Sequence, residues 1–236
     1  MGRNRKPTPT KATIVKIASE LFLENGFLGT TAAEISKKAG ISPGNLTFYF
    51  PTKEHILAVL VERMLAFQRQ ELARERAAGK SALLSYCLEL TALAAISEEI
   101  PTMYELLAAA YSHPLTLDLI RRSGAEKLRE VFCDGKADGD GEEIAELEAI
   151  VSGIEYATLM HTEHSASLPH RIEGALEAIL LLFGVPEDTR REKIAEVLST
   201  DYRAAGRRVY ADFRRYVTEG NRHALDEVLR TTEHRA

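Results

Sequence analysis

The spacing of apolar residues constrains the fold of this chain more than any other sequence feature. From residue 10 onward, apolar side chains recur at intervals of three and four residues, without a sustained alternation of apolar and polar residues. The first spacing gathers apolar groups on one face of a helix, whereas alternation is typical of a strand. The sequence therefore predicts an all-α fold.

Glycine and proline residues divide this helical sequence into segments. The first expected helices are Thr10–Asn25, Thr31–Ala39, Pro43–Phe50, Lys53–Ala78, Ser81–Ser97, Thr102–Ser112 and Leu115–Val131. After an expected loop at Gly135–Gly141, the others are Glu142–Ser165, His170–Phe183, Glu187–Leu198, Tyr202–Val217 and Ala224–Leu229. The 236 residues exceed one typical domain of about 100–150 residues. We therefore predict two domains, 1–52 and 53–236, with extra helices after residue 186.

The distribution of charge supports this division. The formal net charge of the chain is −5, which by itself argues weakly against nucleic-acid binding because DNA-binding domains are usually basic. Residues 1–60, however, hold eight Lys and Arg against four acidic residues, a net of +4, and the remainder holds 22 against 31, a net of −9. Such a change of sign is expected between a DNA-binding module and an acidic partner domain.

Composition narrows the class of protein further. Hydrophobic residues make up 45% and charged residues 28% of the chain, which is typical of a globular protein. The longest apolar run, Ala178–Phe183, is far shorter than the roughly 20 residues of a membrane-spanning helix, and the N-terminus has no apolar signal region. We therefore expect a cytoplasmic protein. Cys87 and Cys133 lack the spacing of a zinc site or a disulfide framework.

Two short expected helices around Gly40 form the most informative unit of the sequence. Thr30 or Thr31 can cap the first of these helices, with Glu34 positioned to complete a capping box from Thr31. Gly40 permits the turn, and Ser42 can cap the second helix. Pro43 suits the first helical position because its missing N–H needs no partner there. Two helices joined by such a glycine turn form a helix-turn-helix, which seats its second helix in the DNA major groove.

The residue types on and beside the second helix suit contacts with DNA. Gly44 allows close approach of the backbone, Asn45 and Thr47 can bond base edges or phosphate, and Phe48 can contact a thymine methyl group. Lys53, Tyr49 and the Thr31 hydroxyl are placed to hold phosphates, which position a protein without specifying sequence. The expected DNA-binding residues are Arg5, Lys6, Thr31, Ser42, Pro43, Gly44, Asn45, Thr47, Phe48, Tyr49 and Lys53. Arg5 and Lys6 belong to a basic N-terminal arm that either follows the DNA or is simply solvated.

The run from Ala33 to Glu54, AEISKKAGISPGNLTFYFPTKE, resembles the signature of the TetR family of repressors. The preceding segments ASELF at residues 18–22 and NGF at 25–27 also match, so that the resemblance covers the first quarter of the chain. One position departs from the pattern, because Thr47 stands where the family commonly has tyrosine. The resemblance implies a homodimer, a four-helix interface made by two core helices of each chain, and a variable pocket that releases DNA when it is filled.

Beyond this module, we expect a larger helical ligand-binding and dimerisation bundle. Its sulfur-containing and aromatic residues are individually typical of a core, but together they suit an adaptable apolar cavity. The expected ligand-binding residues are Met64, Phe67, Tyr86, Met103, Tyr104, Leu107, Tyr111, Tyr156 and Met160. Glu155 and His113 are candidates for polar pocket residues, although surface or core roles suit them equally well.

We expect the homodimer to form through residues 142–183. Two apolar stripes there predict the contact surface. These stripes consist of Ile144, Leu147, Val151, Ile154 and Thr158, followed by Leu176, Ile179, Leu180 and Phe183.

Other kinds of site receive little support from the sequence. His161 and His164 are three residues apart and could share a helix face, but no third ligand stands at a convincing position, so we expect neither a metal nor a cofactor. Phosphate-binding loops and nucleophile motifs are absent, and we expect no enzyme.

The sequence thus predicts a ligand-responsive repressor that binds a palindromic operator in double-stranded DNA. Its effector would be a small, largely apolar molecule. Two alternatives stay open. One is an activator or DNA-binding protein without an effector, and the other is a helical protein-interaction module.

Overall fold

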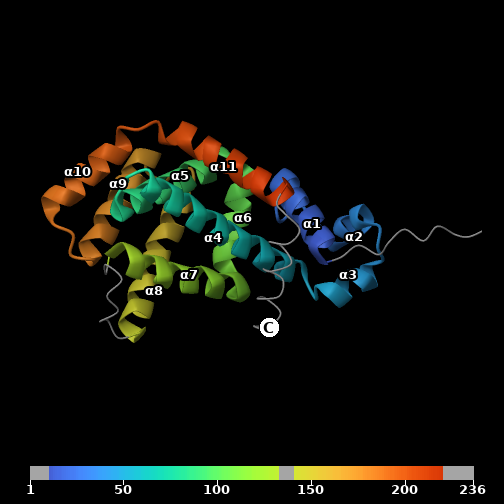
Figure 1. Ribbon diagram of the computed structural model, residues 1–236. Coiled ribbons are helices and arrows are strands. Elements are labelled where there is room, and N and C mark those ends of the chain that lie inside the picture. Colours follow the sequence, from blue (N-terminus) through green and yellow to red (C-terminus); the bar gives the residue numbers. More distant parts are fainter. Residues whose placement is uncertain (1–10, 133–140, 220–236) are drawn as a thin grey trace, which may run out of the picture.

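The computed structural model describes residues 11–132 and 141–219, and these residues form eleven helices (Figure 1). The N-terminal helices are α1 (Lys11–Asn25), α2 (Ala32–Ala39) and α3 (Pro43–Tyr49). The others are α4 (Lys53–Ala77), α5 (Ala82–Glu99), α6 (Pro101–Ser112), α7 (Pro114–Phe132), α8 (Gly141–Leu159), α9 (Leu168–Leu182), α10 (Glu187–Leu198) and α11 (Tyr202–Glu219). The all-α prediction is confirmed. The expected helix Ala224–Leu229 and Cys133 lie outside the described residues.

Helix α8 ends six residues earlier than the sequence predicts. It stops at Leu159, and residues 160–167 form a connection to α9, whereas the expected helix continued to Ser165. The connection is held by its own bonds, because the Thr162 backbone N–H donates to the Ser165 hydroxyl at 2.8 Å. The His161 ring packs edge-on against the ring of Tyr104, with 5.1 Å between centroids. Tertiary packing therefore ends a helix that local sequence would allow to continue.

Helices α1, α2 and α3 form a compact module at one end of the molecule (Figure 1). Its core contains Phe22, Ile35 and Leu46, which are at most 4% exposed. Around this core, Ala39 and Ile41 are half-buried. Packing of these apolar groups sets the angle between α2 and α3.

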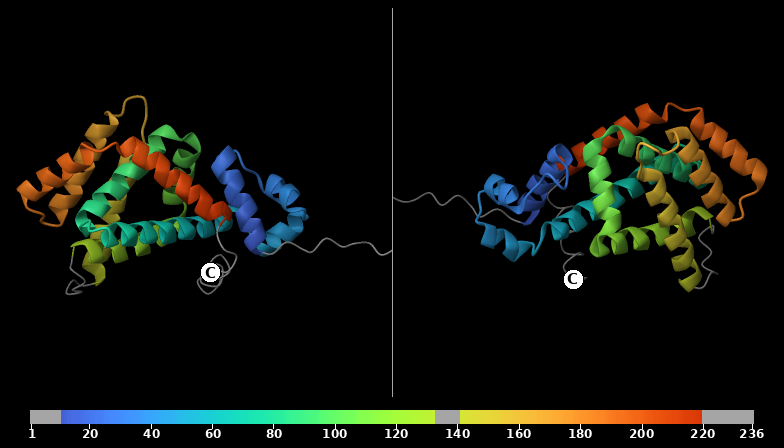
Figure 2. Two further views of the ribbon diagram at one scale, coloured as in Figure 1. Left: turned by 45° about the horizontal axis from the view of Figure 1, so that its top comes forward. Right: turned by 180° about the vertical axis from the view of Figure 1, so that it is seen from behind.

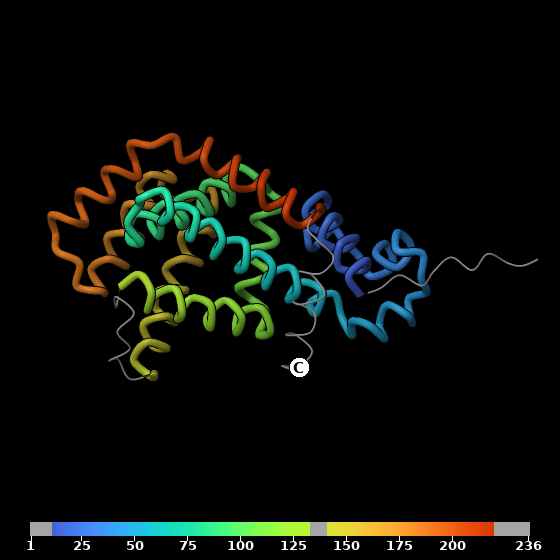
Figure 3. Tube along the Cα trace, viewed as in Figure 1, coloured from blue at the N-terminus to red at the C-terminus, as the bar shows by residue number. Residues whose placement is uncertain are grey.

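Helix α5 lies at the centre of the larger bundle, where α4, α6, α7, α8, α9, α10 and α11 all contact it. It is apolar on nearly every side, as expected for a helix enclosed by others. Figure 3 shows the chain passing around this helix and ending with α10 and α11 on the outside.

The last described helix, α11, runs back along α5 and reaches the N-terminal module (Figures 1 and 3). The guanidinium group of buried Arg63 in α4 donates to the carbonyl oxygens of Val217 at 3.1 Å and Tyr216 at 2.8 Å. Arg214 of α11 pairs with Glu24 of α1 at 3.5 Å. The final turn of α11 is therefore fastened both to α4 and to the module.

In the part of the chain that the structure describes, no helix is long and apolar enough to cross a membrane. Cys87 is buried, and burial raises the pKa of its thiol to about 12. A thiol in this state is unreactive at neutral pH.

Candidate nucleic-acid interface

The turn between α2 and α3 has the geometry that its sequence predicts. The Thr31 hydroxyl accepts from the Glu34 N–H at 3.2 Å, and the Glu34 carboxylate accepts from the Thr31 N–H at 2.8 Å, which completes the capping box. Gly40 has a φ of 69°, in the left-handed region that favours glycine. The Ser42 hydroxyl then accepts from the Asn45 N–H at 3.2 Å and caps α3.

The side of α3 that faces away from the core is open to an approaching ligand. Gly44, Asn45 and Thr47 are exposed, and the Phe48 ring is 84% exposed. An added Cβ at Gly44 would meet only the Ser42 hydroxyl oxygen, 4.0 Å away. A short helix with small and polar groups on its outer face can enter a major groove about 12 Å wide.

Several polar groups of this surface already have partners within the module. The Thr47 hydroxyl donates to the Pro43 carbonyl oxygen at 3.1 Å, and the Thr31 hydroxyl donates to the Glu34 carboxylate at 2.9 Å. These two bonds set the side-chain orientations, and each oxygen keeps acceptor capacity. The two hydrogen bonds from Thr31 lower the pKa of Glu34, so its carboxylate is ionised at neutral pH.

Lys53 begins α4 and holds the loop that precedes α2. Its ammonium group donates to the carbonyl oxygens of Phe27 at 2.9 Å and Thr30 at 3.2 Å. An ammonium group has three donor hydrogens, so one remains for another acceptor. The expected phosphate contact of Lys53 therefore stays a prediction. Its ammonium group also has a structural role through the two bonds to carbonyl oxygens. Arg5 and Lys6 lie outside the described residues.

An exposed recognition helix, a left-handed glycine turn and two capped helix starts define this module as a helix-turn-helix. Residues 14–60 match the family model described as bacterial regulatory proteins, tetR family. The module thus resembles the helix-turn-helix of the tetR family, and the resemblance predicted from the sequence is confirmed.

Two curated relatives from Escherichia coli strain K12 match part of the chain. The HTH-type transcriptional regulator UidR is 38% identical over 68 residues, which are 29% of this chain and 33% of the relative. The HTH-type transcriptional regulator RutR is 35% identical over 63 residues, 27% of this chain and 30% of the relative. The match therefore spans about a third of the length of these relatives.

A solved structure extends the likeness in fold beyond the module. The crystal structure of Thermus thermophilus FadR, a TetR family transcriptional repressor in complex with lauroyl-CoA, superposes with a TM-score of 0.54. Sequence identity is 24%, and the superposition covers 71% of this chain and 91% of that one. The larger bundle therefore shares the general fold of that repressor.

The expected ligand-binding residues do not all converge on one cavity. Met64, Tyr86, Leu107 and Tyr111 line a central cavity of about 40 Å³ between α4, α5, α6, α7 and α8, while Phe67 lines a second cavity. The other expected residues, Met103, Tyr104, Tyr156 and Met160, line neither of these cavities. Tyr156 is 38% exposed on the outer side of α8.

The central cavity is more polar than the sequence predicts. Both Tyr86 and Tyr111 donate from their hydroxyl groups to the Glu155 carboxylate, each at 3.1 Å. Burial raises the pKa of Glu155, and it raises the pKa of Glu148 to about 7. Glu155, an open candidate from the sequence, is thus a cavity residue. Glu148 was missed, although its position three residues before Val151 and seven before Glu155 places it on the same helix face.

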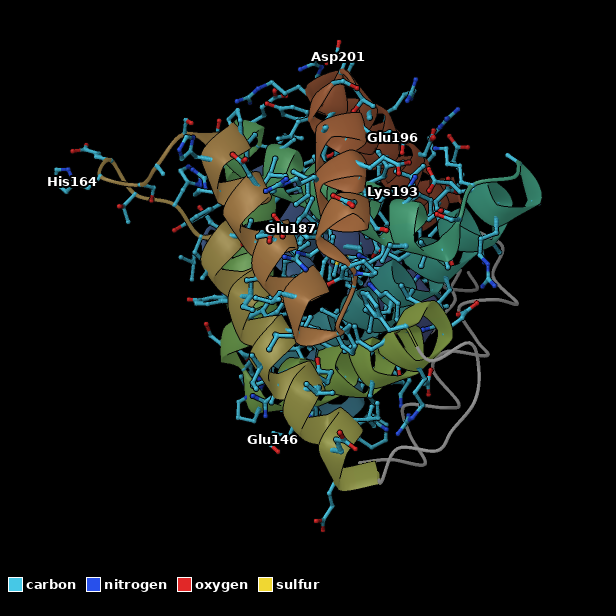
Figure 4. The ribbon with its side chains drawn as sticks, turned by 90° about the vertical axis from the view of Figure 1, so that its left-hand side faces the viewer. Glu146, His164, Glu187, Lys193, Glu196 and Asp201 are labelled. Carbon is cyan, nitrogen blue, oxygen red and sulfur yellow. The ribbon has the colours of Figure 1, made fainter. Side chains whose placement is uncertain are left out.

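Most residues of the two apolar stripes expected to form the dimer surface face the interior instead. Leu176, Ile179 and Leu180 are fully buried, and Ile144, Val151 and Thr158 are at most 5% exposed. The other three, Leu147, Ile154 and Phe183, are half-buried. The outward sides of α8 and α9 carry small and apolar residues instead. These are Ile150, Gly153 and Ala157 on α8 and Gly174, Leu181 and Leu182 on α9. Helices α8 and α9 lie at the end of the molecule opposite the module (Figure 1), and this end faces the viewer in Figure 4.

His161 and His164 do not form a shared helix face, because both lie beyond the end of α8. Figure 4 shows His164 projecting from the connection between α8 and α9, away from the rest of the molecule. Among residues 11–132 and 141–219, no group of three His, Cys, Asp or Glu side chains could hold a metal ion.

Proposed function

We propose that this chain is a ligand-responsive transcriptional repressor that binds a palindromic operator as a homodimer. The observation that carries the proposal is the capped and exposed α3, joined to α2 through Gly40 and matched by the tetR family model. In this proposal residues 1–52 form the DNA-binding domain and residues 53–236 form the regulatory domain.

The outward faces of α8 and α9 support a dimer. Gly153 and Gly174 leave room for close approach of another helix, and Leu181, 58% exposed, supplies apolar surface beside them. Two helices from each of two chains would form a four-helix interface around a twofold axis. A twofold dimer requires an operator with two related half-sites.

Helix α4 provides the mechanical link between effector and DNA. It starts at Lys53 beside the module and contributes Met64 and Leu65 to the central cavity. A small, largely apolar molecule bound to the regulatory domain would favour a different tilt of α4. The two recognition helices of a dimer must lie about 34–36 Å apart to enter successive major grooves. A tilt of α4 would change this spacing, and the operator would be released.

Selection of bound fragments from genomic DNA tests this proposal. We expect the full chain to enrich fragments with a shared palindromic site, and small molecules suggested by the neighbouring genes to release them. Enrichment without any common site would contradict operator recognition.

A DNA-binding protein without a small-molecule effector, either an activator or a repressor, is the second candidate. The central cavity favours it, since about 40 Å³ is far below the roughly 300–1,000 Å³ of ligand sites. Operator affinity that no small molecule changes would support this candidate.

A further inference from the structure

A larger cavity lies on the other side of α4 and α5 from the central one. It has a volume of about 630 Å³ and is lined by residues of α4, α5, α11 and the end of α10. Figure 2 (left) shows the backbones of α4, α5 and α11 as three sides of a triangle. The cavity volume falls within the range of roughly 300–1,000 Å³ that small-molecule sites occupy.

The inner lining of this outer cavity is apolar and belongs to helices distant in sequence. Phe67 and Leu72 come from α4, Leu88 from α5, and Ala205 and Val209 from α11. Leu88, Ala205 and Val209 are half-buried rather than enclosed, so their apolar surface is available to an occupant. An apolar body of more than ten heavy atoms would replace water along this lining.

One polar group on the inner wall lacks a partner. Glu89 accepts from the Lys127 ammonium through Oε1 at 2.9 Å, and its side chain is 12% exposed. Its other oxygen, Oε2, is buried and has no hydrogen-bond partner among the described residues. A buried carboxylate oxygen without a donor is costly, so a ligand that supplies an N–H at this point gains binding free energy.

The charges around this cavity favour a cation. Gln68, Glu89 and Leu93 line both the outer and the central cavity and so separate them. The lining residues of the outer cavity carry five carboxyl groups against two cationic groups, those of Lys80 and Arg208. An arriving ammonium group would be attracted by this excess, and a carboxylate would be repelled.

We propose that the outer cavity binds an apolar organic amine, with its chain along α4, α5 and α11 and its ammonium group beside the Glu89 carboxylate. The regulatory role of this cavity rests on the proposed repressor function. The inference adds to that function the site and the chemical class of the effector. A ligand here touches both helices that hold the module, because α4 begins at Lys53 and α11 pairs with α1 through Arg214 and Glu24.

Calorimetric titration of the DNA-free chain with decylamine, decan-1-ol and decanoate tests the cavity directly. The three probes share one chain length and differ in the head group. We expect decylamine to bind at one site, decan-1-ol to bind about tenfold or more weakly, and decanoate to bind least. Tightest binding by decanoate, or no binding by decylamine, would overturn the proposal.

Matched variants locate the site. Ala205→Phe fills the cavity and is expected to abolish decylamine binding, whereas Ala211→Phe, at an exposed position on the same helix, is not. If thermal unfolding shows that Ala205→Phe does not fold, Leu88→Phe replaces it as the variant that fills the cavity. Glu89→Gln is expected to weaken binding about tenfold or more, and Glu196→Gln at the rim is not. Equal binding by Glu89→Gln and Glu196→Gln, or by Ala205→Phe and Ala211→Phe, would place decylamine elsewhere.

DNA affinity separates this inference from the proposed function. Binding of DNA without decylamine tests the repressor proposal, and calorimetry without DNA tests the cavity. We expect decylamine to weaken binding to the selected operator in the parent chain but not in Ala205→Phe. An operator affinity that falls equally in both chains would exclude this cavity as the effector site.

Discussion

The Lys53 ammonium group donates to the Phe27 carbonyl oxygen at 2.9 Å and lies 4.2 Å from the centroid of the Phe27 ring. One side chain at the start of α4 thereby binds both the backbone and the aromatic group of the loop before α2. The junction between the module and the bundle is therefore held by a directional contact in addition to apolar packing. Movement of α4 would be passed directly to the helix-turn-helix.

Replacing Lys53 is expected to weaken DNA binding without changing sequence preference. Lys53→Met loses the positive charge and both carbonyl contacts, so affinity is expected to fall on all sequences. The slope of log affinity against log salt would decrease by about one. Anisotropy titrations on operator and random DNA at several salt concentrations measure both effects. Lys16→Met, an exposed lysine of α1, is the control, and a loss confined to the operator would contradict the phosphate role.

Replacing Arg63 is expected to release the end of α11. Arg63→Met leaves the carbonyl oxygens of Val217 and Tyr216 without their donor, which is expected to lower the free energy of unfolding by about 2–4 kcal/mol. Chemical denaturation measures this change. Arg69 lies on the same helix as Arg63 and donates one hydrogen bond to the Ser123 hydroxyl. Arg69→Met is therefore expected to lower the free energy of unfolding by less than Arg63→Met. Equal stability of Arg63→Met and the parent chain would show that the contact does not hold α11.

Stability is expected to decrease as pH rises because of Glu148. Glu148 as a whole residue is 3% exposed, and burial, together with Glu155, raises the pKa of its carboxyl from 4.5 to about 7. Between these two values the folded state binds more protons than the unfolded state, so raising the pH favours unfolding. The loss is on the order of 3 kcal/mol across this window.

The variant Glu148→Gln removes the titrating group and tests this assignment. Its denaturation midpoint is expected to depend less on pH between 4.5 and 7 than that of the parent chain. Glu146→Gln, on the exposed side of α8, is the control and should keep the full dependence. Parallel pH profiles for Glu148→Gln and the parent chain would contradict the assignment to Glu148.

The outward face of α8 and α9 is expected to hold the dimer together. Leu181→Glu places a charge in the centre of the apolar contact, where a buried unpaired carboxylate opposes association. Sedimentation velocity at micromolar concentration is expected to show a dimer for the parent chain and a monomer for Leu181→Glu. Leu115→Glu, 41% exposed on α7, controls for a general effect of added charge. A monomeric parent chain would refute the interface.

The local features of the module could be predicted from the sequence because each depends on a few neighbouring residues. Thr31 and Glu34 reveal their capping box by spacing alone, and Gly40 and Pro43 mark the turn by their backbone preferences. The exposed side of α3 follows from these elements, because the apolar residues of a short helix determine which side remains outside.

The long-range features could not be predicted in the same way. The apolar spacing of Leu176, Ile179 and Leu180 indicates a buried face, but periodicity does not distinguish burial within one chain from burial between two. The end of α8 at Leu159 carries no glycine or proline signal, and His161 just beyond it packs against Tyr104 of another helix. Most residues that line the outer cavity come from α4, α5 and α11, and more than half of the chain lies between α4 and α11. Local sequence patterns do not show that such distant residues come together.

Hydroxyl-radical footprinting on a selected genomic fragment tests the central claim most directly. The account predicts two protected half-sites whose centres are about one helical turn, roughly 34–36 Å, apart or a multiple of this distance. Asn45→Ala and Thr47→Ala are expected to lower discrimination against altered bases in each half-site by about 1–3 kcal/mol while protection of the backbone persists. Protection that is continuous and independent of sequence, and unchanged in both variants, would contradict the assignment of α3 as the helix that reads DNA.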